Sequence, residues 1–200
     1  AYGNQPNIAR WNLARFAETL LPLVADADDE ASVQRAVAQA TAVIDAFPAA
    51  YEAELLRGQR AKLGLTAATP ADHADDAQLV RDWLSLLHAQ AADFTLAWRA
   101  LADAAEGRDA PLRARLAEPA AAETWLARWR ERCARDDAAG GAGARRAEGM
   151  RLASPWLIPR NHRVEDALNR AMHDGDLAPF ERLLGALRRP YAEDAAVADL

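Results

Sequence analysis

Cysteine and lysine are almost absent from this sequence of 200 residues. Cys133 is the only cysteine, so the chain cannot form an internal disulfide and suits a reducing compartment. Lys62 is the single lysine among 24 lysine and arginine residues. A reaction that requires a lysine must therefore use Lys62 or a residue outside this chain.

Long hydrophobic runs and excess positive charge are lacking as well. No apolar run approaches the ~20 residues that cross a bilayer. The residues after Ala1 are neither basic nor apolar, so we expect no signal peptide. The net charge of −6 argues against general binding to nucleic acid or anionic membranes. We therefore expect a cytoplasmic protein with no nucleic-acid partner and no membrane partner.

Apolar residues are plentiful, at 51% of the chain, which is enough to bury a core. The length suits one domain, or one domain with a small appendage. No segment alternates polar and apolar residues as a half-buried strand does, and apolar residues recur every three or four positions instead. The pattern predicts an all-α fold.

The first predicted helix follows Pro6, which fits a first helical turn because its missing N–H would have no partner there. Pro22 is expected to end it. Its broad apolar face consists of Trp11, Leu13, Phe16, Leu20 and Leu21. Such a face is typical of a buried core helix. The alternative is that Asn4 and Gln5, which precede it, lie near a functional cleft.

Three more helices are expected before residue 102. Asp28 or Asp29 can cap one that runs to Phe47, and Pro48 separates it from the next, which Gly64 should end. Apolar spacing then predicts one helix over 79–101.

Asp93-Phe94-Thr95 falls in the middle of that last pattern. It invites comparison with the metal-binding Asp-Phe-Gly of kinases, but the third residue differs and the kinase motif follows a strand. We therefore reject the match.

Helices should also begin at Pro111 and Pro119. In the second, Trp125 and Trp129 are four residues apart and should stack, with Cys133 continuing the same face as a buried, inert thiol. The glycines of 136–150 favour a mobile connection over a phosphate loop, because the Gly-Lys-Ser/Thr ending is missing.

The last quarter contains an extended strap, Trp156-Leu157-Ile158, held between Pro155 and Pro159. Asn161 can cap the helix that follows. Val164, Leu168 and Met172 recur every four residues on one face of it. Gly175 and Asp176 then separate it from a final helix that ends before Pro190.

The stretch from Arg128 to Arg163 is rich in positive charge, with nine arginines and only four acidic residues. We interpret this as a scattered solvated face, with a phosphate site or a contact to an acidic domain as alternatives. His162 and His173 match no zinc spacing. Nothing in the pattern assembles a nucleophile with a base, a metal site or a nucleotide cradle, so we predict no catalytic, cofactor-binding or metal residue.

Two blocks of the sequence resemble a known family. The opening YGNQPNIARWNLARFAETLLPL is similar to the segment just past the catalytic core of the selenoprotein O family, the pseudokinase-like protein adenylyltransferases. The closing block resembles the C-terminal signature of that family, from Ile158-Pro159-Arg160-Asn161-His162 through Leu187 to Tyr191. A weaker third block is Asp93-Phe94-Thr95 with Trp98-Arg99-Ala100-Leu101.

The resemblance implies a protein-kinase-like fold, of which this chain would be the C-terminal helical bundle. It implies an enzyme that binds ATP with Mg²⁺ and transfers AMP to Ser, Thr or Tyr of proteins. The lysine, aspartate and metal ligands of the family lie before the opening block, so no catalytic residue is carried over. We expect neither ATP nor Mg²⁺ on this part alone. The family-motif residues, with no role assigned, are Asn4, Gln5, Pro6, Arg160 and Asn161.

Two departures from the family pattern stand out. Ser154 replaces an asparagine common before the proline, and the chain ends at Leu200 without the terminal cysteine or selenocysteine of many members. The latter and the lone Cys133 disfavour a redox protein.

We thus expect a region that braces the catalytic lobe of a longer enzyme. Its partners would be the missing N-terminal kinase-like part and the protein substrates. The alternative is a free-standing helical interaction module without catalysis. The predicted divisions are a helical bundle over 1–135, a flexible linker over 136–150, a strap with a helical pair over 151–191 and a tail over 192–200.

Overall fold

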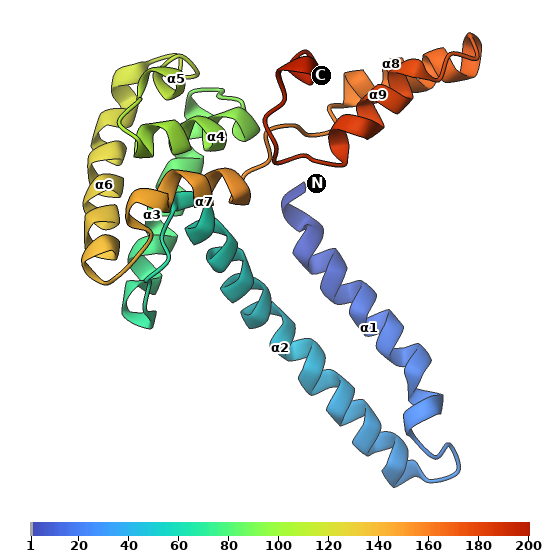
Figure 1. Cartoon of the computed structure of the whole chain (residues 1–200). Coiled ribbons are helices and arrows are strands. Elements are labelled where there is room, and N and C mark those ends of the chain that lie inside the picture. Colours follow the sequence, from blue (N-terminus) through green and yellow to red (C-terminus); the bar gives the residue numbers. More distant parts are fainter. Residues whose placement is uncertain (1) are drawn as a thin grey trace. The chain divides into compact units, whose positions relative to one another are not determined.

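The computed structural model describes the backbone of residues 2–200 and the burial of residues 3–200. These residues form helices joined by short turns (Figure 1). Within these residues there is no β-strand, which confirms the all-α prediction. None of the described helices combines the length and apolar composition that a bilayer-spanning segment needs. The α-helices are α1 (Gln5–Val24), α2 (Glu30–Leu63), α3 (His73–Ala89), α4 (Phe94–Ala105), α5 (Ala110–Arg113), α6 (Glu123–Ala138), α7 (Arg146–Ala153), α8 (Asn161–His173) and α9 (Ala178–Leu187).

The chain divides into two compact units, Ala1–Arg57 and Gly58–Leu200, called here unit 1 and unit 2. The division falls inside α2, and the divisions expected at 135/136 and beyond stay predictions. Residues from the end of α2 and from α3 to α7 share one core, which sequence spacing does not reveal.

Unit 1 contains α1 and most of α2. The acidic turn between them works as predicted, because the Asp29 carboxylate accepts the backbone N–H of Ala31 at 2.9 Å and so caps α2. Arg10 of α1 pairs with Asp45 of α2 at 2.6 Å. No residue of α1 is buried.

Two prolines that were expected to end helices lie inside them. Pro22 lies within α1, and Pro48 lies within α2, which runs on to Leu63. The predictions of helix ends at these prolines are wrong. Each proline removes one helical hydrogen bond, but both are exposed, so the freed carbonyl group can bond water instead.

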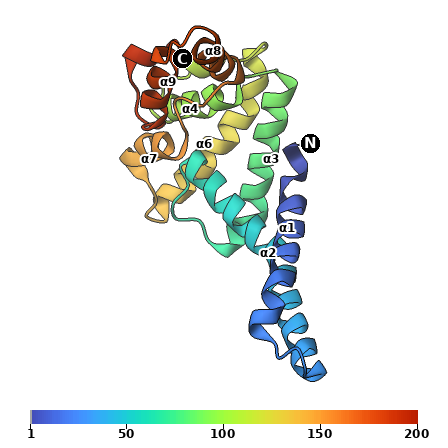
Figure 2. The ribbon, with the colours of Figure 1, turned by 90° about the vertical axis from the view of Figure 1, so that its right-hand side faces the viewer.

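Unit 2 is built around tryptophans. Trp83, Trp98 and Trp129 are at most 2% exposed. The rings of Trp125 and Trp129 stack as predicted, with centroids 6.0 Å apart and planes at 11°. Their indole N–H groups donate to the carbonyls of Leu79 and Leu63, respectively, at 2.9 and 3.0 Å. These bonds satisfy the polar end of each ring and connect α6 to α3 and to the end of α2; α3 and α6 lie side by side in Figures 1 and 2.

The predicted single helix over 79–101 is two helices. α3 ends at Ala89, Ala91 takes a left-handed conformation with φ 48°, and α4 starts at Phe94. Asp93 caps α4 by accepting the N–H of Leu96 at 2.9 Å. The placement of Asp93 in the middle of a helix is therefore wrong, although no strand precedes it within the described residues. A capping aspartate competes with helix continuation, because its side chain bonds backbone N–H groups that a helix leaves open.

Segment 136–150, expected as a flexible linker, contains the end of α6, a 3-10 turn and the start of α7. Asp136 is only 1% exposed. Gly141 lies against its carboxylate so closely that an added Cβ would be 1.9 Å from Oδ2. In the structure the glycines therefore make room for a tight turn around a buried acid.

The strap over 155–159 is non-helical, as predicted. The backbone N–H groups of Trp156 and Leu157 both donate to the carbonyl of Pro190, at 2.7 and 3.1 Å. α8 already includes Asn161, and Arg160 is its N-cap without a side-chain bond, so the capping role predicted for Asn161 is wrong. Gly175, with φ 68°, separates α8 from α9 as expected.

Candidate functional site

Arg99 of α4 forms four hydrogen bonds that join distant parts of unit 2. Arg99 is buried, with 8% of its surface exposed. Its Nη1 donates to the carbonyls of Arg151 and Ser154, at 2.7 and 3.0 Å. Its Nε and Nη2 donate to Oε1 of Glu193, at 3.2 and 2.8 Å. One guanidinium thus joins α4, the end of α7 with the strap, and the segment after α9.

A second contact joins the same blocks. Arg160, at the end of the strap, pairs with Oδ2 of Asp93 at 2.7 Å. The other oxygen of this carboxylate caps α4 through Leu96. One aspartate therefore holds both the start of α4 and the end of the strap. The weaker middle block of the resemblance and its C-terminal block are in contact in the folded chain.

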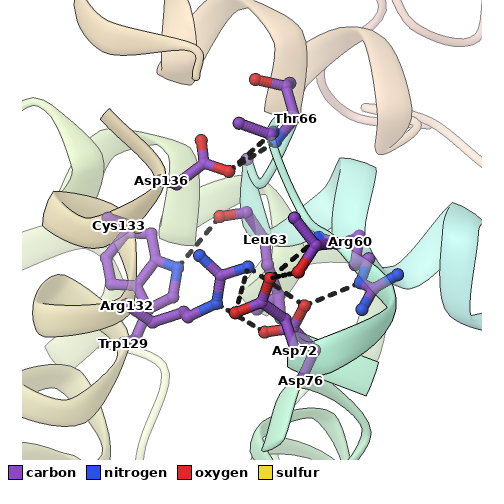
Figure 3. A network of polar contacts seen from close by, with 12 residues as sticks. Arg60, Leu63, Thr66, Asp72, Asp76, Trp129, Arg132, Cys133 and Asp136 are labelled. Atoms are coloured by element: carbon purple, nitrogen blue, oxygen red, sulfur yellow. Dashed lines mark hydrogen bonds and ion pairs between the residues drawn. The ribbon is translucent and has the colours of Figure 1, made fainter. Parts of the chain in front are cut away.

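Asp76 is the centre of a buried ion-pair network (Figure 3). It is 0% exposed and lies between Arg60 and Arg132. Arg60 bonds Oδ2 at 2.7 Å, and Arg132 bonds Oδ1 at 2.7 Å and Oδ2 at 3.2 Å. Burial acts to lower the pKa of the Arg132 guanidinium, but the hydrogen bond and charge of Asp76 outweigh it and the pKa is raised. The network joins α2, α3 and α6, so its role is to hold helices together.

Asp136 forms a neighbouring junction (Figure 3). Its Oδ1 accepts the backbone N–H groups of Thr66 and Ala67, at 3.0 and 2.8 Å. Its Oδ2 accepts that of Ala142 at 3.3 Å, and Arg146 lies 3.5 Å from the same oxygen. A buried carboxylate with these donors is satisfied where it stands.

The glycine-rich turn between α6 and α7 does not have the arrangement of a phosphate loop. A phosphate loop needs free backbone N–H groups. In the glycine-rich turn, those of Ala142 and Gly143 already bond the carboxylates of Asp136 and Asp137, at 3.3 and 2.7 Å. Within residues 2–200, no three histidine, cysteine or acidic side chains come together as a metal site would require.

The single cysteine and the single lysine both have shifted pKa values. Burial raises the pKa of the Cys133 thiol to about 11, in agreement with the predicted buried, inert thiol. Burial lowers the pKa of Lys62, whose ammonium lies 5.7 Å from the centroid of the Trp98 ring.

The residues predicted as family motifs fall in different units. Asn4 precedes α1 and accepts a hydrogen bond from the Asn7 amide at 3.0 Å, while Gln5 is exposed and Pro6 lies in the first turn of α1 as predicted. In unit 2, Arg160 has a defined partner in Asp93 and Asn161 is exposed. Of the five, only Arg160 acquires a structural role from a long-range contact.

The arginines of 128–163 form a scattered solvated face only in part. Arg128 pairs with Asp82 at 2.7 Å, Arg130 with Asp109 at 2.5 Å, and Arg151 with Asp103 at 2.8 Å. Arg132 and Arg146 are buried. Several of these arginines thus pair with acids from outside the stretch, whereas Arg135 and Arg145 are exposed, so the interpretation holds for only part of the stretch.

Sequence reasoning missed Arg99, Asp76 and Glu193 as junction residues. Arg99 offered one signal, since it stands in the apolar run of Thr95–Leu101 where a charged side chain requires a partner. Asp76 and Glu193 offered none, because their partners lie 56 and 94 residues away.

Comparison with known proteins extends over nearly the whole chain. Residues 1–188 match the family model described as Protein adenylyltransferase SelO. Relatives named Protein nucleotidyltransferase YdiU include one from Rhizobium etli (strain CIAT 652), 46% identical over 193 residues, which are 96% of this chain and 36% of the relative. One from Chromobacterium violaceum is 47% identical over 197 residues, covering 96% and 38%. One from Cereibacter sphaeroides (strain KD131) is 48% identical over 195 residues, covering 98% and 36%. The chain thus spans little more than a third of these relatives' length.

Proposed function

The chain belongs to the SelO family of protein adenylyltransferases, and from this premise we propose that it is the C-terminal helical part of an enzyme that transfers AMP from ATP to Ser, Thr or Tyr of proteins. Its own task is to brace the catalytic part, which has a kinase-like fold. ATP and Mg²⁺ bind to that other part, and the present residues complete it.

The main support for this role is the exposed apolar face of α1 in unit 1. α1 buries no residue, and Trp11 and Phe16 are 58% and 59% exposed. Between α1 and α2 lies a groove of about 580 Å³ whose lining residues, except Gln39, are all apolar. Exposed apolar patches of this kind mark interaction sites. We assign this face to the remaining part of the parent enzyme.

Unit 2 supports the role of a brace in a different way. Its charged junctions at Asp76, Asp136 and Arg99 already use their partners inside the unit. The residues have the arrangement of a scaffold, since their hydrogen bonds connect helices and do not converge on an open site. A free-standing interaction module would also expose an apolar face, so the test must separate the two functions.

The test combines this chain with the part of the Rhizobium etli relative that the match leaves out, expressed as a separate polypeptide. With ATP labelled at the α-phosphate and Mg²⁺, we expect this chain alone to bind no nucleotide and to label no protein. Together, the two parts should form a complex and transfer labelled AMP. The double variant Trp11→Asp, Phe16→Asp should abolish both effects.

The matched control is Leu152→Asp, an exposed apolar residue of unit 2, which should leave complex formation unchanged. Micromolar Mg²⁺-dependent ATP binding by this chain alone would contradict the proposal. So would a failure of the two parts to associate, which would favour the interaction module.

A further inference from the structure

The last part of unit 2, from Trp156 in the strap onward, does not share the main core of the unit. Its buried apolar residues are Leu157, Ala167 and Leu183, and none of them belongs to the core that extends from the end of α2 to α7. α8 and α9 pack on each other, and neither makes comparable contact with a helix of that core. We call residues 156–200 the arm and residues 58–154 the body.

The arm is closed on itself. The backbone N–H groups of Trp156 and Leu157 donate to the carbonyl of Pro190, at 2.7 and 3.1 Å, which ties the strap to the end of α9. Arg182 of α9 bonds both carboxylate oxygens of Asp199, at 2.9 and 2.6 Å. The strap, the α8–α9 pair and the segment after α9 are therefore attached to one another and form one piece.

The backbone passes from the body to the arm at Pro155. On one side of it, Ser154 is buried and its carbonyl accepts Nη1 of Arg99 at 3.0 Å. On the other side, the N–H of Trp156 is held within the arm by Pro190. Because proline fixes its own φ, the torsion left to turn between these two anchors is the ψ of Pro155.

Two ion pairs join the arm to the body among the described residues. Nε and Nη2 of Arg99 donate to Oε1 of Glu193 at 3.2 and 2.8 Å, and Arg160 pairs with Asp93 at 2.7 Å. The Glu193 side chain is 59% exposed, so water can take its place. Arg99 would then still bond two backbone carbonyls of the body, which keeps its own junction when the arm is released.

We propose that residues 156–200 form a hinged arm that these two ion pairs clasp to the body. When both pairs open, the arm turns about Pro155 as one piece, while the body keeps its fold. This inference does not depend on the proposed transfer of AMP.

The test measures the distance between two spin labels in the full chain by double electron–electron resonance. The labels are placed on Ala127→Cys in α6 and Asn169→Cys in α8, both exposed positions. Cys133 is buried and the pKa of its thiol is raised to about 11, so it stays unlabelled. We expect one narrow distance distribution in the parent chain. The double variant Glu193→Ala, Arg160→Ala should broaden it at least about twofold, as the arm takes several positions.

The matched control is Asp166→Ala, Arg170→Ala, which also removes one acid and one arginine. Their ion pair lies within α8, so the distance distribution should stay narrow. The near-UV circular dichroism of the buried tryptophans should be the same in the clasp variant as in the parent chain, because their core lies in the body.

A narrow distribution in the clasp variant would overturn the inference, and so would a loss of the tryptophan signal, because the arm would then be part of the core. A broad distribution in the parent chain would overturn it as well, since the two ion pairs would not hold the arm.

Discussion

In unit 2 the tryptophans of α3, α4 and α6 are almost completely buried, whereas in unit 1 Trp11 and Phe16 of α1 remain more than half exposed. Charged residues differ in the same sense. Asp76 of unit 2 is 0% exposed between two arginines, while the pair of Arg10 and Asp45 in unit 1 is 46% and 60% exposed. Similar residue types thus contribute stability in one unit and leave an unpartnered surface in the other. The comparison teaches that residue type alone does not distinguish a buried core from an exposed apolar face.

The largest effect is expected from the buried acid. Asp76→Ala leaves Arg60 and Arg132 without their carboxylate, and breaking a buried pair typically costs about 3–5 kcal/mol. Asp45→Ala, which removes an exposed pair, should cost at most about 1 kcal/mol. Urea unfolding followed by circular dichroism measures both. Equal losses would erase the contrast between the units.

The apolar residues provide a matched pair with the same substitution. Leu101 is 0% exposed and Leu23 is 80% exposed. We expect Leu101→Ala to lower the free energy of unfolding by about 2–5 kcal/mol, because it leaves a cavity. Leu23→Ala should change it by less than about 0.5 kcal/mol. A large loss for Leu23→Ala would show that unit 1 has a core of its own.

A smaller effect is expected at the edge of unit 2, where Asp93 both caps α4 and pairs with Arg160. Asp93→Ala removes both interactions and should cost about 1–2 kcal/mol. Asp93→Asn keeps a capping oxygen and should cost less than about 1 kcal/mol. Thermal unfolding of the two variants distinguishes cap from ion pair; identical losses would assign the whole effect to the ion pair.

The smallest effect is expected on the pH dependence of folding stability. The hydrogen bond from Arg151 lowers the pKa of Glu106 from 4.5 to about 2. Because the pKa is lower in the folded state, the stabilisation is present above about pH 4.5 and is lost as the pH falls toward 2. Glu106→Gln should therefore flatten the fall of the urea midpoint over this range. Glu52→Gln, at an exposed acid of unit 1, is the control; if both variants flatten it equally, the prediction is wrong.

Local features of the fold could be predicted because they depend on neighbours in the sequence. Asp29 caps α2, Gly64 and Gly175 follow helix ends, and the strap between Pro155 and Pro159 is non-helical. The errors are also local in origin. Pro22 and Pro48 do not end their helices, because an exposed helix tolerates a proline. Asp93 caps α4, which the apolar spacing alone does not indicate.

The candidate junctions could be predicted only in part. The resemblance drew attention to the block with Arg99 and to Arg160, but it could not say that Arg99 reaches Glu193 or that Arg160 reaches Asp93. Each partner lies far from its arginine in the sequence. A single sequence does not reveal which distant residues meet in the folded chain.

By itself the sequence determined the helical class, some helix starts and stops, and the resemblance to a family, because these depend on side chains within a few residues of one another. The tertiary structure alone decided which apolar faces are buried, which arginine meets which acid, and that no residue of α1 is buried. The reason is that burial and ion pairing are set by segments that meet only after the chain has folded, and periodic apolar residues look the same in the sequence whether they face a core or solvent.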